Sequence, residues 1–320
     1  MQLPSTSSDA ARDPRSVAGE LFQSVSRAVR GAPDAVRLAL VALLSGGHLL
    51  VEGVPGTGKT LLAKSLAATI GGRFGRVQCT PDLLPADVTG TSVYQPASGE
   101  WEFRPGPIFA NVVLVDEVNR ASPRTQAALL EPMEEHQVTV DGVTHRLPEP
   151  FFLIATENPF GSAGTFPLPE SQLDRFGIVC TLGLPGRDAE REILGGAGGV
   201  DALDAIEAVT SPGELVDTIT AIRNVHCAHS VLDYVLDVSD ATRTHPNVAL
   251  GASPRASLGL LHAAQANATG MGRDFVSPDD VKAVAAGALA HRISLANGID
   301  VRAAADLVGE IVGTVAAPRP

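Results

Sequence analysis

Residues 53–60 form a glycine-rich segment, Gly-Val-Pro-Gly-Thr-Gly-Lys-Thr, whose spacing fits the pattern G-x-x-x-x-G-K-[ST]. In that pattern the glycines let backbone N–H groups converge on phosphate oxygens, while the lysine neutralises the outer phosphates and the threonine hydroxyl can ligate Mg²⁺. The alternative is an ordinary glycine-rich turn between a strand and a helix. We predict a phosphate-binding segment, the P-loop, that comprises Gly53, Val54, Pro55, Gly56, Thr57, Gly58, Lys59 and Thr60, extended by Leu61.

Two carboxylates, Asp116 and Glu117, follow the apolar run of residues 112–115. They would lie at the carboxyl end of a buried strand, where open α/β sheets bind ligands. There Asp116 would hold through water the Mg²⁺ that Thr60 ligates, and Glu117 would polarise an attacking water molecule. An acidic pair that ends a strand is more often the start of a solvated loop. Its position after the P-loop favours the catalytic interpretation.

A second apolar run, residues 151–155, is followed by Thr-Glu-Asn, which ends at Asn158. If this run is a strand of the same sheet, Asn158 lies at the same edge as the carboxylates and could orient the water. The alternative role of Asn158 is to form a turn before Pro159, which asparagine favours.

These side chains need a scaffold of strands that end at one edge. Residues 48–51 are short and apolar and lead into the P-loop, as a buried parallel strand does. Leu62, Leu66 and Ile70 then repeat at helical spacing. With the runs at 112–115 and 151–155, this succession predicts a parallel α/β sheet. Residues 17–44 predict two more helices, joined by a turn at residues 31–33.

The pattern changes beyond residue 185, where strand-like runs fade. Three helix starts share a serine cap followed by proline, at Ser211, Ser253 and Ser277. We therefore predict three regions: a flexible tail (1–16), an α/β nucleotide-binding core (17–184) and an all-helical lid domain (185–320).

Composition and charge exclude several classes of protein. The net charge of −12 and the pI near 5.1 oppose binding to a nucleic-acid backbone. No run reaches the roughly 20 apolar residues that span a bilayer, and the first sixteen residues lack the pattern of a secretory signal. We expect a cytoplasmic location. The three cysteines are far apart in sequence, which predicts reduced packing residues.

The ordered motifs resemble the MoxR group of AAA+ ATPases, in the helix-2-insert branch that also holds the ATPase subunit of magnesium chelatase. The resemblance extends from residue 48 to residue 293. Its segments are HLLVEGVPGTGKT, TPDLLPADVTG, GEWEFRPGPIFANVVLVDEVNRA, EEHQVTVDGVTHRLPEPFFLIAT, GTFPLPESQLDRF and GASPRASL.

The resemblance implies binding of ATP and Mg²⁺ by a hexameric ring whose sites lie between subunits. It gives Asn158 the part of sensor 1, Arg175 that of an arginine finger and Arg255 that of sensor 2. Arg255 also stands in the first turn of a predicted helix, where a cation opposes the helix dipole. A nearby phosphate would explain this placement, and an arginine that extends into solvent is the alternative.

The resemblance also implies two projecting β-hairpins. Residues 93–104 would form the helix-2 insert, and residues 138–144 would form a hairpin before sensor 1. The second hairpin is predicted independently by its Asp-Gly turn.

Three segments depart from the usual family pattern. Residues 29–33 read Val-Arg-Gly-Ala-Pro where a segment close to the adenine base is usual, so the adenine contacts stay open. Glu157 stands where glutamine is common. Pro132 interrupts a predicted helix and should remove one backbone hydrogen bond and kink it.

We expect an ATPase that remodels a partner protein in the manner of a chaperone. The resemblance implies a client or adaptor protein with a von Willebrand factor A domain. The alternatives are a magnesium chelatase-like ATPase subunit and a nucleotide-binding scaffold that does not hydrolyse. A DNA-remodelling motor is disfavoured by the acidity of the chain.

Overall fold

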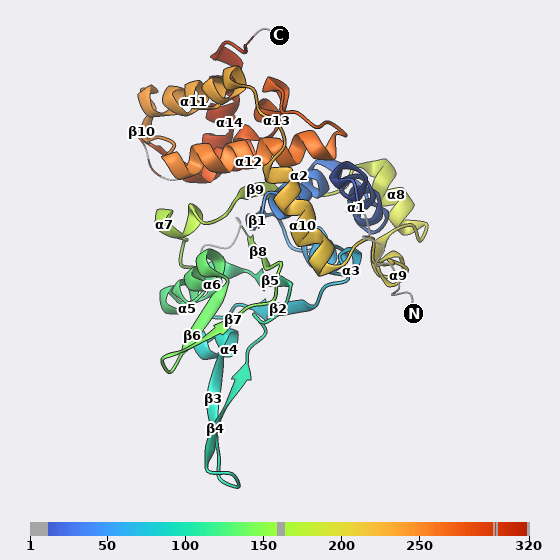
Figure 1. Cartoon of the computed structure of the whole chain (residues 1–320), viewed down its shortest axis with the longest axis vertical. Helices are drawn as coiled ribbons and strands as arrows, with labels where there is room; N and C mark the ends of the chain where they lie inside the picture. Colours follow the sequence, from blue (N-terminus) through green and yellow to red (C-terminus); the bar gives the residue numbers. More distant parts are fainter. Residues whose placement is uncertain (1–11, 159–163, 297, 299, 319–320) are drawn as a thin grey trace, which may run out of the picture.

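A parallel five-stranded sheet forms the centre of the computed structural model, which describes residues 12–158, 164–296, 298 and 300–318 (Figure 1). The strand order is β2-β5-β8-β1-β9, and each neighbouring pair is parallel. The predicted parallel sheet is therefore confirmed. Its strands are β1 (Leu49–Glu52), β2 (Phe74–Gln78), β5 (Val112–Asp116), β8 (Phe152–Glu157) and β9 (Ile178–Thr181).

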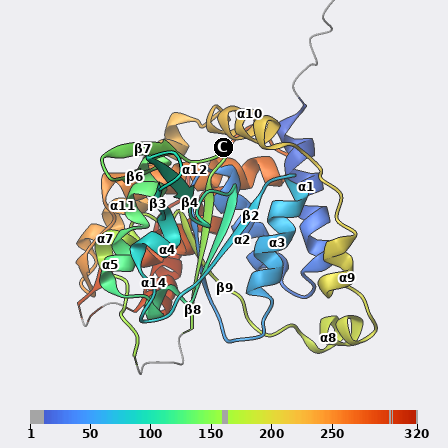
Figure 2. The same ribbon diagram turned by 90° about the horizontal axis from the view of Figure 1, so that it is seen from below.

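Three helices cover one face of this sheet: α1 (Pro14–Ala28), α2 (Pro33–Leu44) and α3 (Lys59–Thr69). Figure 2 shows α1 and α3 together on one side of the strands. The two predicted N-terminal helices are confirmed, but α1 begins inside the predicted flexible tail. The Asp13 side chain accepts the backbone N–H of Arg15, and Pro14 takes the first helical position. Together these residues start a helix without an apolar repeat. Residues 1–11 of the tail lie outside the described residues.

The opposite face carries short helices and the two hairpins. The helical elements are α4 (Pro85–Thr89), η1 (Val118–Arg120), α5 (Pro123–Ala127), α6 (Leu130–Glu135) and α7 (Glu170–Leu173). Helix α5 ends and α6 begins around Ala128 and Leu129, one turn before Pro132. Proline has no N–H for the carbonyl four residues earlier, so the predicted kink is confirmed at this interruption.

Both predicted hairpins are confirmed. The first consists of β3 (Gly90–Gln95) and β4 (Glu100–Pro105), and it projects far from the sheet (Figure 1). The second consists of β6 (Gln137–Val140) and β7 (Val143–Arg146). Its turn residues Asp141 and Gly142 have φ of 51° and 79°, as a type I′ turn requires. Phe103 stacks on His145 with ring centroids 3.8 Å apart, so the two hairpins are in contact.

The rest of the chain is mainly helical, as predicted. Its elements are α8 (Arg187–Leu194), α9 (Gly199–Asp204), α10 (Pro212–Arg223), α11 (His229–Thr244), β10 (Val248–Leu250), α12 (Pro254–Gly270), α13 (Pro278–Leu289), η2 (Ala290–Arg292), β11 (Ser294–Leu295) and α14 (Val301–Thr314). The small antiparallel sheet of β10 and β11 corrects the expectation of an all-helical lid. Strands of two and three residues are too short to show an alternating pattern.

Helices α11 to α14 gather in one layer beyond α2 and β9 (Figure 1). Helix α9 packs instead against α1 and α3, and α10 packs against α12 of this layer as well as against α1 and α2. The domain boundary at residue 185 stays a prediction. The three cysteines are free, as expected, and within the described residues no helix is long and apolar enough to cross a membrane.

Candidate functional site

The P-loop joins β1 to α3 and has the geometry of an anion cradle. Gly56 and Gly58 have φ of 83° and 97°, which residues with a side chain rarely adopt, and a Cβ at either would face open space. Helix α3 starts at Lys59 with no side-chain cap and no acidic residue in its first turn. Its unpaired N–H groups and its positive dipole end therefore suit phosphate.

Lys59 lies within the cradle. Its ammonium group donates to the carbonyl oxygens of Gly53, at 2.5 Å, and Val54, at 3.1 Å. Partial burial lowers the pKa of Lys59, while the negative charges of Asp116 and Glu117 act in the opposite direction. The structure thus brings the lysine close to the acidic end of β5. A phosphate would offer this ammonium group a stronger acceptor than a carbonyl oxygen.

Asp116 ends β5 and is held on both carboxylate oxygens. The Thr156 hydroxyl donates to one at 2.7 Å, and Arg76 binds the other at 2.9 Å. The side chain of Asp116 is 13% exposed, so it is fixed rather than solvated. Oxygen donors of this kind suit Mg²⁺, which is usually held by few protein groups together with phosphate oxygens and water. Asp116 and Thr60 would be those groups here.

Glu117 has an unusual backbone conformation, with φ of 55° and ψ of 51°. Its N–H donates to the Thr156 hydroxyl at 2.9 Å, and its carboxylate pairs with Arg120 at 3.0 Å. A left-handed conformation at a residue with a side chain is strained and is found preferentially at functional sites. Here it turns the chain sharply out of the strand directly after Asp116.

Asn158 follows β8, which lies between β5 and β1 in the sheet. It is the last described residue before the gap at 159–163. Its position at the same sheet edge as Asp116 and the P-loop agrees with the expected placement of a residue that orients water.

Arg175 and Arg255 lie together at the junction of core and lid. Both bind the Glu134 carboxylate of α6, Arg175 at 3.0 Å and Arg255 at 2.7 Å. Arg255 also reaches Asp174 at 3.6 Å. The structure thus groups these two arginines with each other, and Lys59 with Asp116 and Glu117. Glu134 and Asp174 place two carboxylates beside this cation in the first turn of α12. The phosphate-binding role of Arg255 stays a prediction.

Several supporting residues were missed by the sequence analysis. Thr156 binds both Asp116 and the backbone of Glu117, and a polar residue within an apolar strand was a signal for it. Arg76, Glu134 and Arg292 gave no such signal, because their partners are distant in sequence. Arg292 is 5% exposed beside Asp174, at 3.4 Å, and burial lowers its pKa to about 10.

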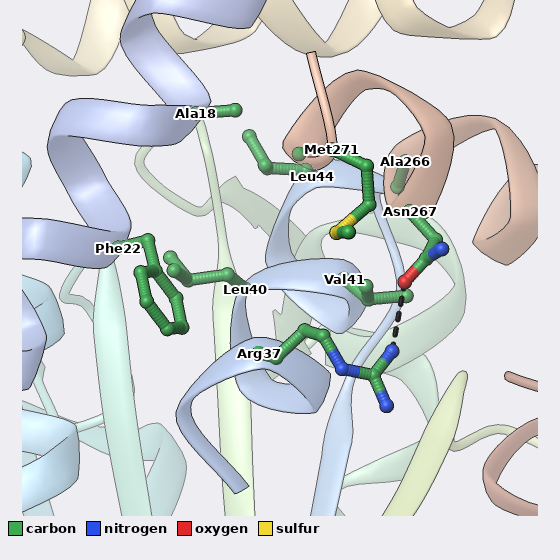
Figure 3. A pocket seen from close by; sticks show the side chains of 10 residues that line it. Ala18, Phe22, Arg37, Leu40, Val41, Leu44, Ala266, Asn267 and Met271 are labelled. Carbon is green, nitrogen blue, oxygen red and sulfur yellow. Dashed lines mark hydrogen bonds between the residues drawn. The ribbon is translucent and has the colours of Figure 1, made fainter. Parts of the chain in front are cut away.

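A separate cavity of about 110 Å³ lies between α1, α2 and α12 (Figure 3). Its walls are apolar except for Arg37 and Asn267, which are joined by a hydrogen bond of 2.7 Å. With these polar groups paired to each other, the cavity presents no chemistry for hydrolysis.

Comparisons with known proteins agree with this geometry. Residues 48–178 match the family described as ATPase family associated with various cellular activities (AAA), and residues 240–311 match the AAA lid domain. The solved structure of a protein from Cytophaga hutchinsonii, which carries the provisional description of an ATPase, superimposes on this chain with a TM-score of 0.86. It is 35% identical, and the match covers 96% of each chain.

Proteins with similar sequences support the same family assignment. The uncharacterized protein YeaC of Bacillus subtilis is 44% identical over 94% of each chain. The chaperone MoxR1 of Mycobacterium tuberculosis is 42% identical, over 85% of this chain and 74% of its own. Protein MoxR of Methylorubrum extorquens is 31% identical over 96% of each chain. These likenesses span core and lid together, and the chain therefore belongs to the MoxR family of AAA+ ATPases.

Proposed function

We propose that this protein hydrolyses ATP with Mg²⁺ and uses the cycle to remodel or mature a partner protein. The observation that carries the hydrolysis proposal is the grouping of Lys59, Asp116 and Glu117 at one edge of the sheet. In this assignment Lys59 binds the outer phosphates and Asp116 and Thr60 hold Mg²⁺, which neutralises charge on the phosphates. Glu117 accepts a proton from the attacking water, and Asn158 orients that water.

Arg175 and Arg255 belong to a second half of the site, which we propose is supplied by a neighbouring subunit of a hexameric ring. Their common link to Glu134 supports this assignment, because it holds two guanidinium groups at one place on the core–lid surface. Two cations together suit the negative charge that develops on a γ-phosphate during transfer.

The chaperone-like part of the proposal is supported by the name of the relative in Mycobacterium tuberculosis, chaperone MoxR1. We propose that the client or its adaptor is a protein with a von Willebrand factor A domain, and that the ring acts in the cytoplasm. The chain's acidity still disfavours a nucleic-acid client.

Phosphate release from MgATP by the purified protein tests the hydrolysis proposal. Lys59→Ala should reduce ATP affinity at least about 100-fold, because the ammonium group is the main positive charge on the phosphates. Lys64→Ala is the matched control, since Lys64 is exposed on the same helix, and it should bind ATP normally. Equal affinity in Lys59→Ala, or no phosphate release by the wild type with ATP bound, would contradict the proposal; the second result would favour a non-hydrolysing scaffold.

A further inference from the structure

Two carboxyl side chains lie side by side at the edge of the sheet. Glu52 is the last residue of β1 and Glu157 the last of β8, and they are direct partners in the parallel register. Adjacent strands are about 4.8 Å apart, so both side chains leave the same face as neighbours. Leu50 and Ala155, two residues earlier, belong to the core cluster on the face away from α3. The pair is therefore on the opposite face from helix α3.

The first turn of lid helix α14 lies next to this pair. Val301 packs against both core clusters of the sheet. The positive charge of Arg302 favours the ionised form of Glu52, and Asp300 opposes it. Arg302 can therefore compensate one negative charge at this place, and the pair carries two carboxyl groups.

Among the residues that the structure describes, the other strands of the sheet bring no cation to the pair. Thr181 of β9 is the register partner of Glu52 on its other side and is uncharged. The next strand, β5, ends in Asp116 and Glu117, which pair with Arg76 and Arg120 respectively.

The backbone joins this pair to the site. The N–H of Gly53, the first residue of the P-loop, donates to the carbonyl oxygen of Glu157 at 3.2 Å. Asn158, which we assign to orienting the water, follows Glu157 directly. The main chain of Glu157 is therefore linked directly to both the P-loop and Asn158.

Burial and the charge of Glu52 both raise the pKa of Glu157, to about 7, and burial also raises the pKa of Glu52. Two adjacent carboxylates in a poorly solvated place cannot both ionise without a large cost. Since Arg302 favours the charged form of Glu52, the proton resides on Glu157. The two groups titrate as a pair.

We propose that Glu157 and Glu52 share one proton and act as a positioning pair, in which the neutral state of Glu157 lets the P-loop strand and the Asn158 strand stay side by side in register. This inference rests on the proposed hydrolysis. Loss of the proton places two negative charges side by side and forces the strand ends apart. Hydrolysis should therefore fail as the pH rises, although neither carboxyl group touches the substrate.

The test compares wild type with Glu157→Gln, whose amide keeps a hydrogen-bond donor and cannot ionise. We expect the wild-type kcat to fall at least about fivefold between about pH 6.5 and about pH 8.5, and that of Glu157→Gln to change less than about twofold. Glu310→Gln, at an exposed position on α14, should follow the wild type. In Glu52→Gln an ionised Glu157 has no second negative charge beside it, so the kcat of this variant should also change less than about twofold over the same range.

The thermal midpoint provides a second readout that does not depend on catalysis. The folded pKa of Glu157 is raised from 4.5 to about 7, so the native state holds a proton that the unfolded chain has lost. The stabilisation that this proton provides is fully present at pH values below the pKa of Glu157 in the unfolded chain. It is lost as the pH rises through the pKa of Glu157 in the folded state. The midpoint of Glu157→Gln should rise relative to wild type over that range and then level off.

Parallel midpoint curves for wild type and Glu157→Gln would overturn the shared proton. Identical pH profiles of kcat would overturn the positioning role. If wild type releases no phosphate at any pH, the hydrolysis proposal fails instead, and the midpoint curves still decide whether the pair shares a proton.

Discussion

Glu117 is the residue on which the hydrolysis proposal depends most. Its φ of 55° is maintained by a hydrogen bond from its own N–H to Thr156, whose hydroxyl also holds Asp116. One threonine thus fixes the proposed metal ligand and the proposed base relative to each other. Such strain persists only where the surrounding structure determines the conformation.

Glu117→Gln should bind MgATP with near-normal affinity and hydrolyse it at least about 100-fold more slowly, because the amide cannot accept a proton from water. The ion pair with Arg120 is exposed, so its loss should cost no more than about 1 kcal/mol of stability. Nucleotide titration, single-turnover phosphate release and thermal melting measure the three effects. Normal turnover in this variant would mean that the base is elsewhere.

At the scale of elements, α6 joins core to lid through one side chain. Glu134 binds an arginine of the core and an arginine of the lid, and both arginines hold its pKa below the usual range. All three side chains are partly exposed, so these contacts add little to global stability. These contacts fix the positions of the Arg175 and Arg255 guanidinium groups at the junction of core and lid.

Glu134→Gln should lower kcat about tenfold with a change in thermal midpoint no larger than that of its control, because the arginines lose a common charged acceptor and their orientation. Glu135→Gln is the control, since that neighbour lies on the same helix and its side chain binds Gln137 instead. Equal kcat values for the two variants would show that the arginines find their positions without Glu134.

Much of the fold could be predicted at this scale because the signals were local. An apolar run, a glycine-rich loop and a helical repeat identified β1 and α3, and an Asp-Gly pair identified the β6–β7 turn. Strands β2 and β9 were not identified from the sequence. Strand β2 has Arg76 exposed at the edge of the sheet, and β9 is only four residues long.

The residues of the candidate site could be predicted from the sequence, but their arrangement in space could not. Sequence spacing placed Lys59, Asp116 and Asn158 in order along the chain. It could not show that Arg76 reaches Asp116, forty residues away, or that Glu134 meets Arg255. Contacts of that kind depend on strand order and lid placement, which no local pattern contains.

At the scale of the whole molecule, the P-loop lies between β1 and α3, and the paired arginines lie with Glu134 of α6 at the junction of core and lid. Figure 1 shows the lid helices in a separate layer and the β3–β4 hairpin extending away from them. If the P-loop and the paired arginines are two halves of one ATP site, head-to-tail contact between subunits would bring together halves from neighbouring chains. Contacts of that type close into rings when the rotation between subunits allows it.

Phosphate release by rings that contain both Glu117→Gln and Arg175→Ala chains tests this arrangement most directly. The two variants are co-expressed with different tags, and rings with both tags are isolated. Each variant alone should be nearly inactive. In mixed rings about a quarter of the interfaces pair an intact Glu117 with an intact Arg175, so activity should return to about a quarter of wild type. Mixed rings as inactive as either variant alone would contradict the shared site, and so would an Arg175→Ala protein that is fully active without any partner.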